Sequence, residues 1–210
     1  MPQQEQIILI GGGGHCKSCI DVIEAEAKFK IAGIVDVKEK AGQKVLGCKI
    51  IASDENLPEL AKEFKYFLIT LGQTKSPILR IEKFNLLRQL NVMFPTIISP
   101  SAYVSKHAKV GEGTIIMHRV VVNADANISK NCIINTGVII EHDCLIDDHV
   151  HISPGAVLSG GVSVSKGSFI GTGATVLQGI KIGRDVIVGA GAVVTNDVEN
   201  DRTVKGVPAK

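Results

Sequence analysis

The stretch INTGVIIEHDCLI, residues 134–146, carries an aliphatic residue at every sixth position, at Ile134, Ile140 and Ile146. The step continues in both directions without an insertion, and each time it reaches a branched aliphatic side chain. The sixteen positions are Val104, Val110, Ile116, Val122, Ile128, Ile134, Ile140, Ile146, Ile152, Leu158, Val164, Ile170, Val176, Ile182, Val188 and Val194. A period of six is neither helical nor a plain alternation; it is typical of a parallel β-helix, in which three hexapeptides close one triangular coil. We therefore expect about five coils, stacked about 4.8 Å apart.

A second inward position is expected four residues after each aliphatic one, where a narrow prism has little room. Most residues there are small or β-branched: Ala108, Thr114, Ala126, Cys132, Cys144, Ala156, Ser168, Ala174 and Ala192. Tight corners require positive φ, which glycine and asparagine adopt readily. The residues predicted to serve this purpose are Gly111, Gly113, Asn131, Gly155, Gly167 and Gly183.

The first half of the chain has a different pattern, in which strands and helices alternate. We expect strands at 6–11, 31–36, 66–72 and 92–98, helices at 15–28, 55–64 and 76–90, and a short segment near 45–51. Such alternation predicts a parallel sheet with right-handed crossovers. Its length is about half of a dinucleotide-binding fold, which suits a mononucleotide. The sequence thus predicts a Rossmann-like α/β domain over 1–98 and a β-helix domain with a C-terminal tail over 99–210.

Composition narrows the function classes. A net charge of +2, 4% aromatic residues and no Trp give little material for nucleic-acid binding. The first residues lack a basic segment, and the apolar run Ile7–Ile10 is too short for a signal peptide or a membrane span. We therefore expect a cytoplasmic protein that has no membrane span. Five cysteines, an odd number, favour reduced thiols over a disulfide framework.

A glycine-rich segment, Gly11 to Gly14, follows the first expected strand and opens a helix. Backbone N–H groups and the helix dipole at such a place attract a phosphate. The dinucleotide template has a third glycine where this chain has Cys16, which argues against a dinucleotide. His15 and Lys17 could add charge to a pyrophosphate, or could belong to a solvated helix start.

Two further features of this half have alternative interpretations. Asp36 ends the second expected strand, where an acid can bind a ribose or a base, or can simply be a turn residue. Cys16 and Cys19 have the spacing of a redox motif at a helix start. Cys19 also fits the buried face of that helix.

His142 interrupts the apolar run of the β-helix. It is the third residue of the hexapeptide that begins at Ile140, which places it on an outward corner. The same corner holds Ala124 one coil below and Gly160 one coil above, which leaves space beside the imidazole. Histidine is the usual general base near neutral pH, and Asp143 or Glu141 could raise its basicity.

A metal site is an alternative for the second half. His149 and His151 are spaced by one residue and could ligate zinc, with Asp147 and Asp148 beside them. His142 lies about half a coil away, so a mononuclear site would need ligands from a second chain.

Three segments carry a resemblance to a known family: the Ile-Gly-Gly-Gly-Gly-His stretch from residue 10 to 15, the run from 134 to 146, and the ending Gly206-Val-Pro-Ala-Lys. The chain resembles the bacterial sugar acyltransferases of the sialic-acid O-acetyltransferase type, and most of all the UDP-4-amino-sugar N-acetyltransferases of bacillosamine-type pathways. The resemblance implies a left-handed β-helix, an exception to the usual crossover rule. It also implies a homotrimer, with acetyl-CoA as acyl donor between neighbouring prisms and no metal.

The resemblance also implies residue roles. His142 matches the general base, and Asp143 matches the acid that enhances its basicity. The residues that match nucleotide-sugar contacts are Gly13, Gly14, His15, Val35, Asp36, Gly72, Gln73 and Asn135. His151, Thr172 and Ala190 match the course of acetyl-CoA.

These roles predict a direct transfer. His142 would take a proton from the sugar amine, whose nitrogen attacks the thioester while a backbone N–H stabilises the oxyanion. The expected acceptor is a UDP-linked 4-amino-4,6-dideoxy sugar. The alternatives are O-acetylation of a sialic-acid-type sugar, N-acylation of a GDP-linked amino sugar, a metal-dependent hydratase and a non-catalytic scaffold.

Overall fold

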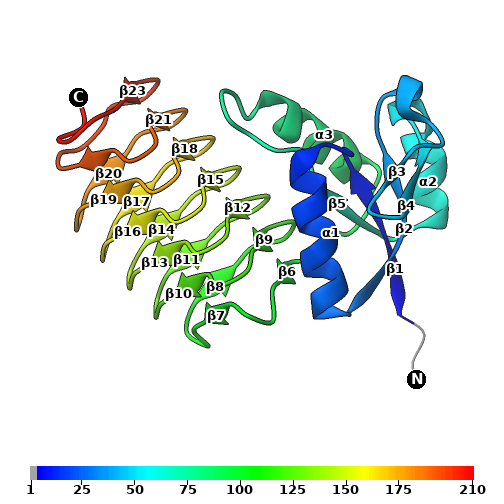
Figure 1. Ribbon diagram of the computed structural model, residues 1–210, viewed down its shortest axis with the longest axis horizontal. Helices are drawn as coiled ribbons and strands as arrows, with labels where there is room; N and C mark the ends of the chain where they lie inside the picture. The colour runs from blue at the N-terminus through cyan, green and yellow to red at the C-terminus, as the bar shows by residue number, and fades with distance from the viewer. Residues whose placement is uncertain (1–3) are drawn as a thin grey trace.

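The computed structural model describes residues 4–210 and contains two units that lie side by side, an α/β unit and a long β-helix (Figure 1). The elements of the first unit are β1 (Glu5–Ile10), α1 (Gly14–Glu26), β2 (Phe29–Val35), η1 (Lys38–Lys40), β3 (Lys44–Val45), β4 (Cys48–Ala52), η2 (Asp54–Asn56), α2 (Leu57–Glu63), β5 (Tyr66–Ile69) and α3 (Ile78–Gln89). Their order follows the alternation predicted from the sequence.

The N-terminal sheet has the order β3-β4-β2-β1-β5. Strands β4, β2, β1 and β5 pair in parallel, and only the short β3 pairs antiparallel. Because helices cover both faces of a parallel sheet, the central parts of its strands are expected to be apolar. Ile7, Ile8 and Leu9 in the central β1 are fully buried, which confirms the predicted sheet type.

The β-helix consists of two-residue strands whose pairing advances by eighteen residues, as in Val121 with Ile139 and then Ile139 with Val157. The strands are β6 (Ile97–Ile98), β7 (Tyr103–Val104), β8 (Lys109–Val110), β9 (Ile115–Ile116), β10 (Val121–Val122), β11 (Asn127–Ile128), β12 (Ile133–Ile134), β13 (Ile139–Ile140), β14 (Leu145–Ile146), β15 (His151–Ile152), β16 (Val157–Leu158), β17 (Ser163–Val164), β18 (Phe169–Ile170), β19 (Thr175–Val176), β20 (Lys181–Ile182), β21 (Ile187–Val188), β22 (Val193–Val194) and β23 (Thr203–Val204). They form three parallel faces.

The three faces differ in size and cover. The seven-stranded face runs from β6 to β23, the six-stranded face from β7 to β22, and the five-stranded face from β8 to β20. The aliphatic residues of the six-residue series are buried from Ile116 onward, and Cys132 and Cys144 at the second inward position are buried too, as the repeat predicts. Val104 and Val110, in the first coil, are only half-buried.

The corner glycines have two different roles. Gly113, Asn131, Gly155 and Gly167 have positive φ, as predicted. Gly111 and Gly183 do not, so the prediction was wrong for these two. A Cβ on Gly111 would lie 2.7 Å from the carbonyl carbon of Ser129 in the next coil, so these two corners need glycine for the close approach of two backbones.

The predicted strand over 92–98 does not form as one element. Met93 makes only an isolated bridge to Tyr66, while Ile97 and Ile98 pair with β9 as part of the seven-stranded face. The first strand of the prism thus lies before the predicted domain boundary at 98. The division of the chain into two domains stays a proposal, with this strand assigned to the second.

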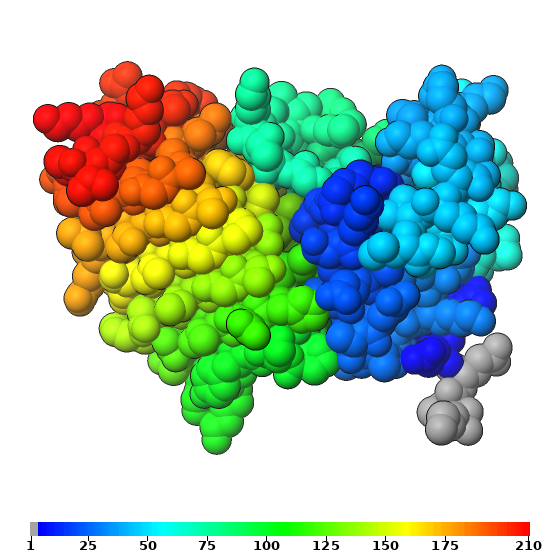
Figure 2. Space-filling view, in the orientation of Figure 1, coloured from blue at the N-terminus to red at the C-terminus, as the bar shows by residue number. Residues whose placement is uncertain are grey.

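The N-terminal unit packs on the seven-stranded face. Helix α1 lies along the first coils, and the segment before α3 reaches later coils (Figures 1 and 2). Ile98 N donates to the carboxylate of Glu26, and Gln73 Nε2 donates to Gly167 O at 2.9 Å. Over residues 4–210, none of the helices is both long and apolar enough to span a bilayer.

Candidate active site

His142 lies on a corner of the β-helix between the six-stranded and five-stranded faces, after β13 and before β14. The corner is fixed by backbone bonds to both neighbouring coils: Asp143 N donates to Ala124 O at 3.2 Å, and Gly161 N donates to His142 O at 2.9 Å. Asp143 adopts the left-handed conformation, with φ of 61°. Aspartate tolerates this region better than most residues, so the sequence suits the turn.

The turn brings two adjacent side chains together. His142 Nδ1 lies 2.7 Å from Asp143 Oδ2, and because a carboxylate only accepts, Nδ1 carries the proton of that bond. In the neutral imidazole Nε2 is then a free acceptor. The hydrogen bond to Asp143 is the largest cause of a raised pKa of His142; desolvation opposes it, and the charges of Asp143 and Glu141 add to it. Glu141 itself accepts from Asn123 Nδ2 at 2.9 Å, so Asp143 is the direct partner.

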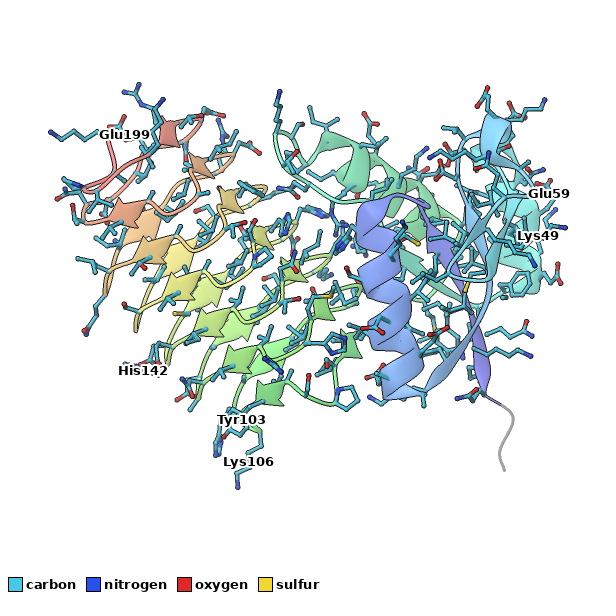
Figure 3. The ribbon with its side chains drawn as sticks, viewed as in Figure 1. Lys49, Glu59, Tyr103, Lys106, His142 and Glu199 are labelled. Atoms are coloured by element: carbon cyan, nitrogen blue, oxygen red, sulfur yellow. The ribbon has the colours of Figure 1, made fainter. Side chains whose placement is uncertain are left out.

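The imidazole is open to solvent on one side and closely backed on the other. The side chain of His142 is 58% exposed (Figure 3). A Cβ on Gly160 would lie 2.6 Å from its Cε1 and 2.7 Å from its Nε2. Glycine at this position therefore makes room for the ring, as the eighteen-residue period predicts.

The glycine-rich loop forms an open helix N-terminus. Helix α1 begins at Gly14, and its N-cap residue Gly13 provides no side-chain cap. A Cβ on Gly13 or Gly14 would meet nothing within 4 Å. Unsatisfied N–H groups at an uncovered helix start can bind an anionic group such as a phosphate.

Asp36 holds this loop against the end of β2. Its carboxylate accepts from Gly12 N and Val37 N, both at 2.7 Å, and from Lys40 Nζ at 3.1 and 3.2 Å. Burial works to raise the pKa of Asp36, but the two backbone bonds and Lys40 hold it below its ordinary value. The side chain of the adjacent Val35 is fully buried, so only its backbone could meet a ligand.

A polar cluster lies between the loop after β5 and the seven-stranded face. His151 is 7% exposed; its Nδ1 donates to Gln73 O at 2.6 Å, and Asn135 Nδ2 lies 3.3 Å from its Nε2. Burial lowers the pKa of His151 to about 4, so the ring is neutral. Gly72 is exposed beside this cluster. A Cβ added to Gly72 would lie 3.4 Å from the Cβ of His15, which is an ordinary van der Waals contact.

His15 belongs to the same cluster. Its ring centroid lies 6.4 Å from that of His151, and its Nε2 is buried without a hydrogen-bond partner. Burial, followed by the nearby charges of Arg80 and His151, lowers the pKa of His15 to about 3. A neutral imidazole with a free nitrogen is available to a ligand that enters from the glycine-rich loop.

Thr172 and Ala190 lie on the corner between the seven-stranded and six-stranded faces. They are exposed and eighteen residues apart, so they stack in successive coils. A Cβ on Gly171 would lie 2.5 Å from Ala190 N, which shows how closely these coils approach.

The predicted residues therefore form separate groups in one chain. Gly13, Gly14, Asp36, Gly72, Gln73, His15, Asn135 and His151 lie where the N-terminal unit meets the seven-stranded face. His142 lies on the corner opposite that face, with the prism core between them, and Figure 3 places it at the edge away from the N-terminal unit. Distances along the sequence could not reveal this separation.

The role of three polar residues at the junction was not predicted from the sequence, which assigned no role to Arg80, identified Asn131 only as a corner residue and identified His149 only as a possible metal ligand. Arg80 lies four and seven residues before the buried Phe84 and Leu87, on the apolar stripe of α3. A charged residue at such a position is a signal that could have identified it.

The redox and metal interpretations do not fit the side chains. Cys16 and Cys19 are fully buried, and burial raises the pKa of Cys16 to about 11 and that of Cys19 further, which disfavours thiolates. His149 and His151 do not share a strand face, because His149 occupies a left-handed corner with φ of 63°. Residues 4–210 contain no group of three or more side chains placed to hold a metal ion.

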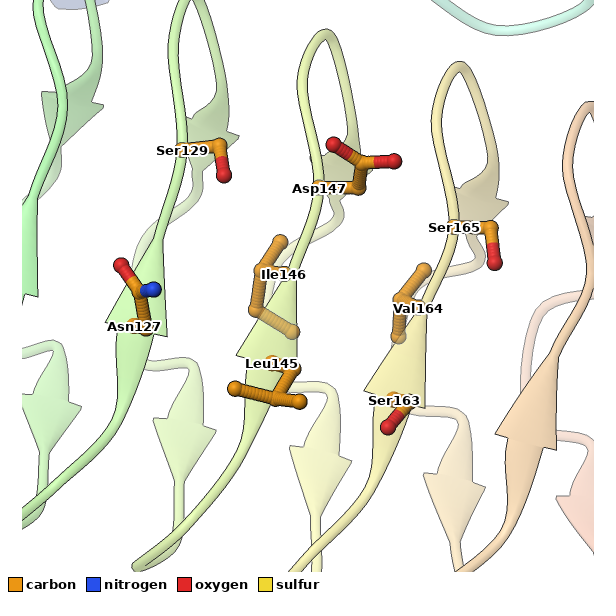
Figure 4. Close-up of a pocket in the computed structure, with 8 residues that line it drawn as sticks. All are labelled: Asn127, Ser129, Leu145, Ile146, Asp147, Ser163, Val164 and Ser165. Atoms are coloured by element: carbon orange, nitrogen blue, oxygen red, sulfur yellow. The ribbon is translucent and has the colours of Figure 1, made fainter.

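A shallow groove of about 310 Å³ crosses the five-stranded face next to the His142 corner (Figure 4). Leu145, three residues after His142 and 53% exposed, lies in it among polar side chains. The other lining residues are Asn127, Ser129, Ile146, Asp147, Ser163, Val164 and Ser165.

Family profiles match both units. The profile of the PglD N-terminal domain matches residues 6–80, and that of the bacterial transferase hexapeptide, in six repeats, matches residues 125–160 and 161–196. Fold and repeat together define a left-handed β-helix acyltransferase, which confirms the predicted fold class.

Individual relatives define the family more closely. PerB from Caulobacter crescentus, in complex with CoA and GDP-perosamine, superimposes with a TM-score of 0.91 at 36% identity, covering 100% of this chain and 97% of that one. The acetyltransferase domain of PglB from Neisseria gonorrhoeae, in complex with acetyl coenzyme A, gives a TM-score of 0.90 at 32% identity over 99% of both chains. The chain belongs to this family of PglD-type sugar N-acetyltransferases.

One curated relative matches a smaller part of this chain. UDP-N-acetylbacillosamine N-acetyltransferase of Bacillus subtilis is 39% identical over 115 residues, which are 54% of this chain and 51% of the relative. The match spans about half the length of that relative. The name of this relative thus contains a UDP-linked sugar, whereas the complex of PerB contains a GDP-linked sugar.

Proposed function

We propose that the protein is an acetyl-CoA-dependent N-acetyltransferase that acts on the amine of a UDP-linked 4-amino-4,6-dideoxy sugar. The observation that carries this proposal is the pair His142 and Asp143 on an exposed corner. A carboxylate there holds the imidazole in one tautomer and directs Nε2 outward beside Gly160. Full-length similarity to enzymes crystallised with CoA or acetyl coenzyme A supports the acyl donor.

The proposed reaction needs one general base. Nε2 of His142 accepts a proton as the sugar nitrogen attacks the thioester carbonyl and forms the N–C bond, and the tetrahedral oxyanion then collapses with cleavage of the C–S bond. The thiolate of CoA then leaves and takes up a proton from the imidazolium. Asp143 stabilises the cationic imidazole during transfer, and the same interaction raises the pKa of His142. No cysteine is required, in agreement with the burial of Cys132 and Cys144.

The nucleotide sugar is assigned to the N-terminal unit. The open N–H groups at Gly13 and Gly14 suit its pyrophosphate, and Asp36 fixes the loop that presents them. Gly72, Gln73, His15 and Asn135 are proposed to line the inner end of this site, and the backbone of Val35 its base. His151, Thr172 and Ala190 stay candidates for acetyl-CoA, although His151 could reach it only after local rearrangement of the Gln73 and Asn135 contacts.

A second chain is needed to complete this site, because His142 and the sugar site lie on opposite sides of one prism. The six-stranded face is the candidate interface: its outward side chains form a half-buried column of Val121, Ile139 and Val157, followed by Thr175 and Val193. Such a largely apolar column on a solvent face is typical of an interaction surface. We propose a homotrimer in which His142 of one chain faces the nucleotide sugar of a neighbour.

An acceptor screen tests the activity. Purified protein is mixed with acetyl-CoA and UDP-, GDP- or CMP-linked sugars that carry an amine or only hydroxyls, and release of free thiol is followed. We expect the fastest release with a UDP-linked 4-amino sugar. Preference for the GDP-linked amino sugar, which the similarity to PerB favours as the second candidate, would replace the UDP assignment. Thiol release with hydroxyl acceptors alone would contradict N-acetylation.

The role of His142 is tested with His142→Ala. Loss of the general base is expected to lower kcat by about 10² to 10⁴, with little change in the KM for either substrate. His107→Ala, at another exposed histidine of the β-helix, is the matched control and should keep full activity. Full thiol release by the His142 variant would remove the catalytic assignment.

A further inference from the structure

Arg80 is a cation buried at the junction of the two units. It extends from the first turn of α3 and is only 2% exposed. Burial lowers the pKa of Arg80 to about 10, so the guanidinium stays charged at neutral pH. Within residues 4–210, no acidic side chain forms an ion pair with it. A buried charge without a counter-ion is costly, so the surrounding polar atoms have to compensate for it.

The compensating atoms come from both units. Nη1 donates to Ile69 O at 3.2 Å and also to Leu71 O, at the end of β5 and in the loop that follows. Nη2 donates to both Asn131 O and Asn131 Oδ1, each at 2.9 Å, on the β-helix. One rigid planar group therefore bridges the loop after β5 and a corner of the prism.

The anchor on the prism side is rigid. Asn131 is fully buried in a left-handed corner with φ of 52°, and its N–H donates to Glu112 O in the coil below. Its Nδ2 lies 2.9 Å from His149 Nδ1 in the coil above, and His149 packs edge-on against Phe84 of α3. Movement of this corner would break contacts in two coils.

The other end of the bridge is the segment that carries Gly72 and Gln73. The side-chain amide of Gln73 donates to Gly167 O, and the backbone carbonyl of Gln73 accepts from His151 Nδ1. With Arg80 bound to Leu71 O, the segment is held to the prism on both sides of Gly72. Gly72 in turn lies close to His15, next to the glycine-rich loop: a Cβ added to Gly72 would lie 3.4 Å from His15 Cβ.

We propose that Arg80 is a positioning residue that fixes the Gly72–Gln73 segment relative to the β-helix and so sets how the nucleotide sugar is held, without touching either substrate. This inference rests on the proposed function for its kinetic consequence. The geometric part, the fastening of the segment by Arg80, is independent of any activity.

The kinetic test uses Arg80→Met and Arg80→Lys, with Arg88→Met on the exposed side of the same helix as the control. Arg80→Met should raise the KM for the nucleotide sugar on the order of tenfold and leave the KM for acetyl-CoA within about twofold, because only the sugar segment loses its fastening. Lysine keeps the charge but lacks the planar fork, so Arg80→Lys should recover part of the loss. Arg88→Met should behave as wild type.

A change of equal size in both KM values would overturn the proposal, as would a fall in thermal stability with unchanged KM values. Asn131→Gly provides a second variant that keeps the left-handed corner but removes the side-chain acceptor for Arg80. It should produce the same selective rise in the KM for the nucleotide sugar; unaltered kinetics in this variant would count against the bridge.

Amide hydrogen exchange tests the geometric part without substrate. In Arg80→Met, peptides from residues 70–78 should exchange faster than in wild type, while peptides from β12 to β15 keep their protection. Unchanged exchange in 70–78 would overturn the proposal whatever the kinetics. If the wild-type protein transferred acetyl to none of the acceptors, the proposed function would fail while this measurement still decided the role of Arg80.

Discussion

At the scale of single residues, the left-handed turn at Asp143 explains how two neighbours in sequence can interact. In an extended strand, His142 and Asp143 would point to opposite faces. The turn brings their side chains within 2.7 Å. The six-residue repeat predicted that His142 faces outward and that Gly160, one coil above, leaves space beside it. It could not decide between Glu141 and Asp143, because the repeat alone does not specify the backbone conformation of the corner.

Asp143→Asn should weaken the base and shift its titration. Below its pKa the imidazole of His142 is protonated and cannot accept a proton, so kcat/KM should rise with pH through that pKa. Asp143 raises the pKa, so the asparagine variant should move the acidic limb to lower pH and lower the plateau rate by about tenfold. Rates measured from pH 5 to 9 test this expectation. Glu141→Gln is the comparison variant: its carboxylate accepts from Asn123 and acts on His142 only through its charge, so the acidic limb should move less than in Asp143→Asn. An unmoved limb in the asparagine variant would contradict the assigned partner.

Gly160→Ala should affect catalysis more than stability. The new methyl group would overlap the imidazole edge, and because a side chain can rotate away, the ring moves while the coil stays intact. A displaced base is expected to lower kcat by about 10- to 100-fold. Steady-state kinetics and thermal unfolding of the same sample provide the measurement. Wild-type kcat in this variant would show that the ring position is not critical.

At the scale of elements, the two halves were predictable to different extents. The β-helix follows from one repeated pattern, so an error at one position does not change the register of the next. The N-terminal elements were recognised, but their ends were not: the strand expected up to residue 72 ends at Ile69. There the chain turns outward, where Thr70 Oγ1 donates to Gly11 O and Arg80 binds the following loop. Such long-range partners leave no local signal.

Leucines 158 and 145 provide a matched pair for the packing of the coils. Leu158 is fully buried in the prism, whereas Leu145 is 53% exposed on the five-stranded face. Leu158→Ala should lower the free energy of unfolding by about 2–5 kcal/mol, because it leaves a cavity in a narrow core. Leu145→Ala should change it by less than about 0.5 kcal/mol. Chemical denaturation measures both, and similar losses would contradict the assigned inward and outward positions.

At the scale of the whole molecule, the junction should make stability depend on pH. Burial holds the pKa of His149 and of His151 at about 4, below the ordinary 6.5. As pH falls from 6.5 toward 4, the unfolded chain takes up protons that the folded chain does not, so stability is present above 6.5 and is lost on acidification. Each histidine should contribute a slope of up to about 1.4 kcal/mol per pH unit. Denaturation of His149→Gln across this range should show a smaller slope of unfolding free energy against pH than wild type. The exposed-site control His107→Gln should keep the wild-type slope. A slope that the His149 variant leaves unchanged would contradict this origin.

Mixing two inactive variants tests whether active sites are shared between chains. His142→Ala removes the proposed base, and Asp36→Ala removes the hydrogen bond that holds the proposed phosphate-binding loop with Gly13 and Gly14; each variant should be nearly inactive as a pure oligomer. Because His142 lies on the corner opposite the sugar site, a site that joins two chains needs His142 from one and Asp36 from the other. When the two variants are unfolded together and refolded, some mixed copies of the proposed trimer should therefore contain an intact pair, and activity should return to a sizeable fraction of wild type. The same proteins refolded separately and then combined should stay inactive unless chains exchange. If co-refolded samples form mixed oligomers but remain inactive, each site must draw His142 and the sugar loop from the same chain, which would require a large movement of the N-terminal unit around the prism.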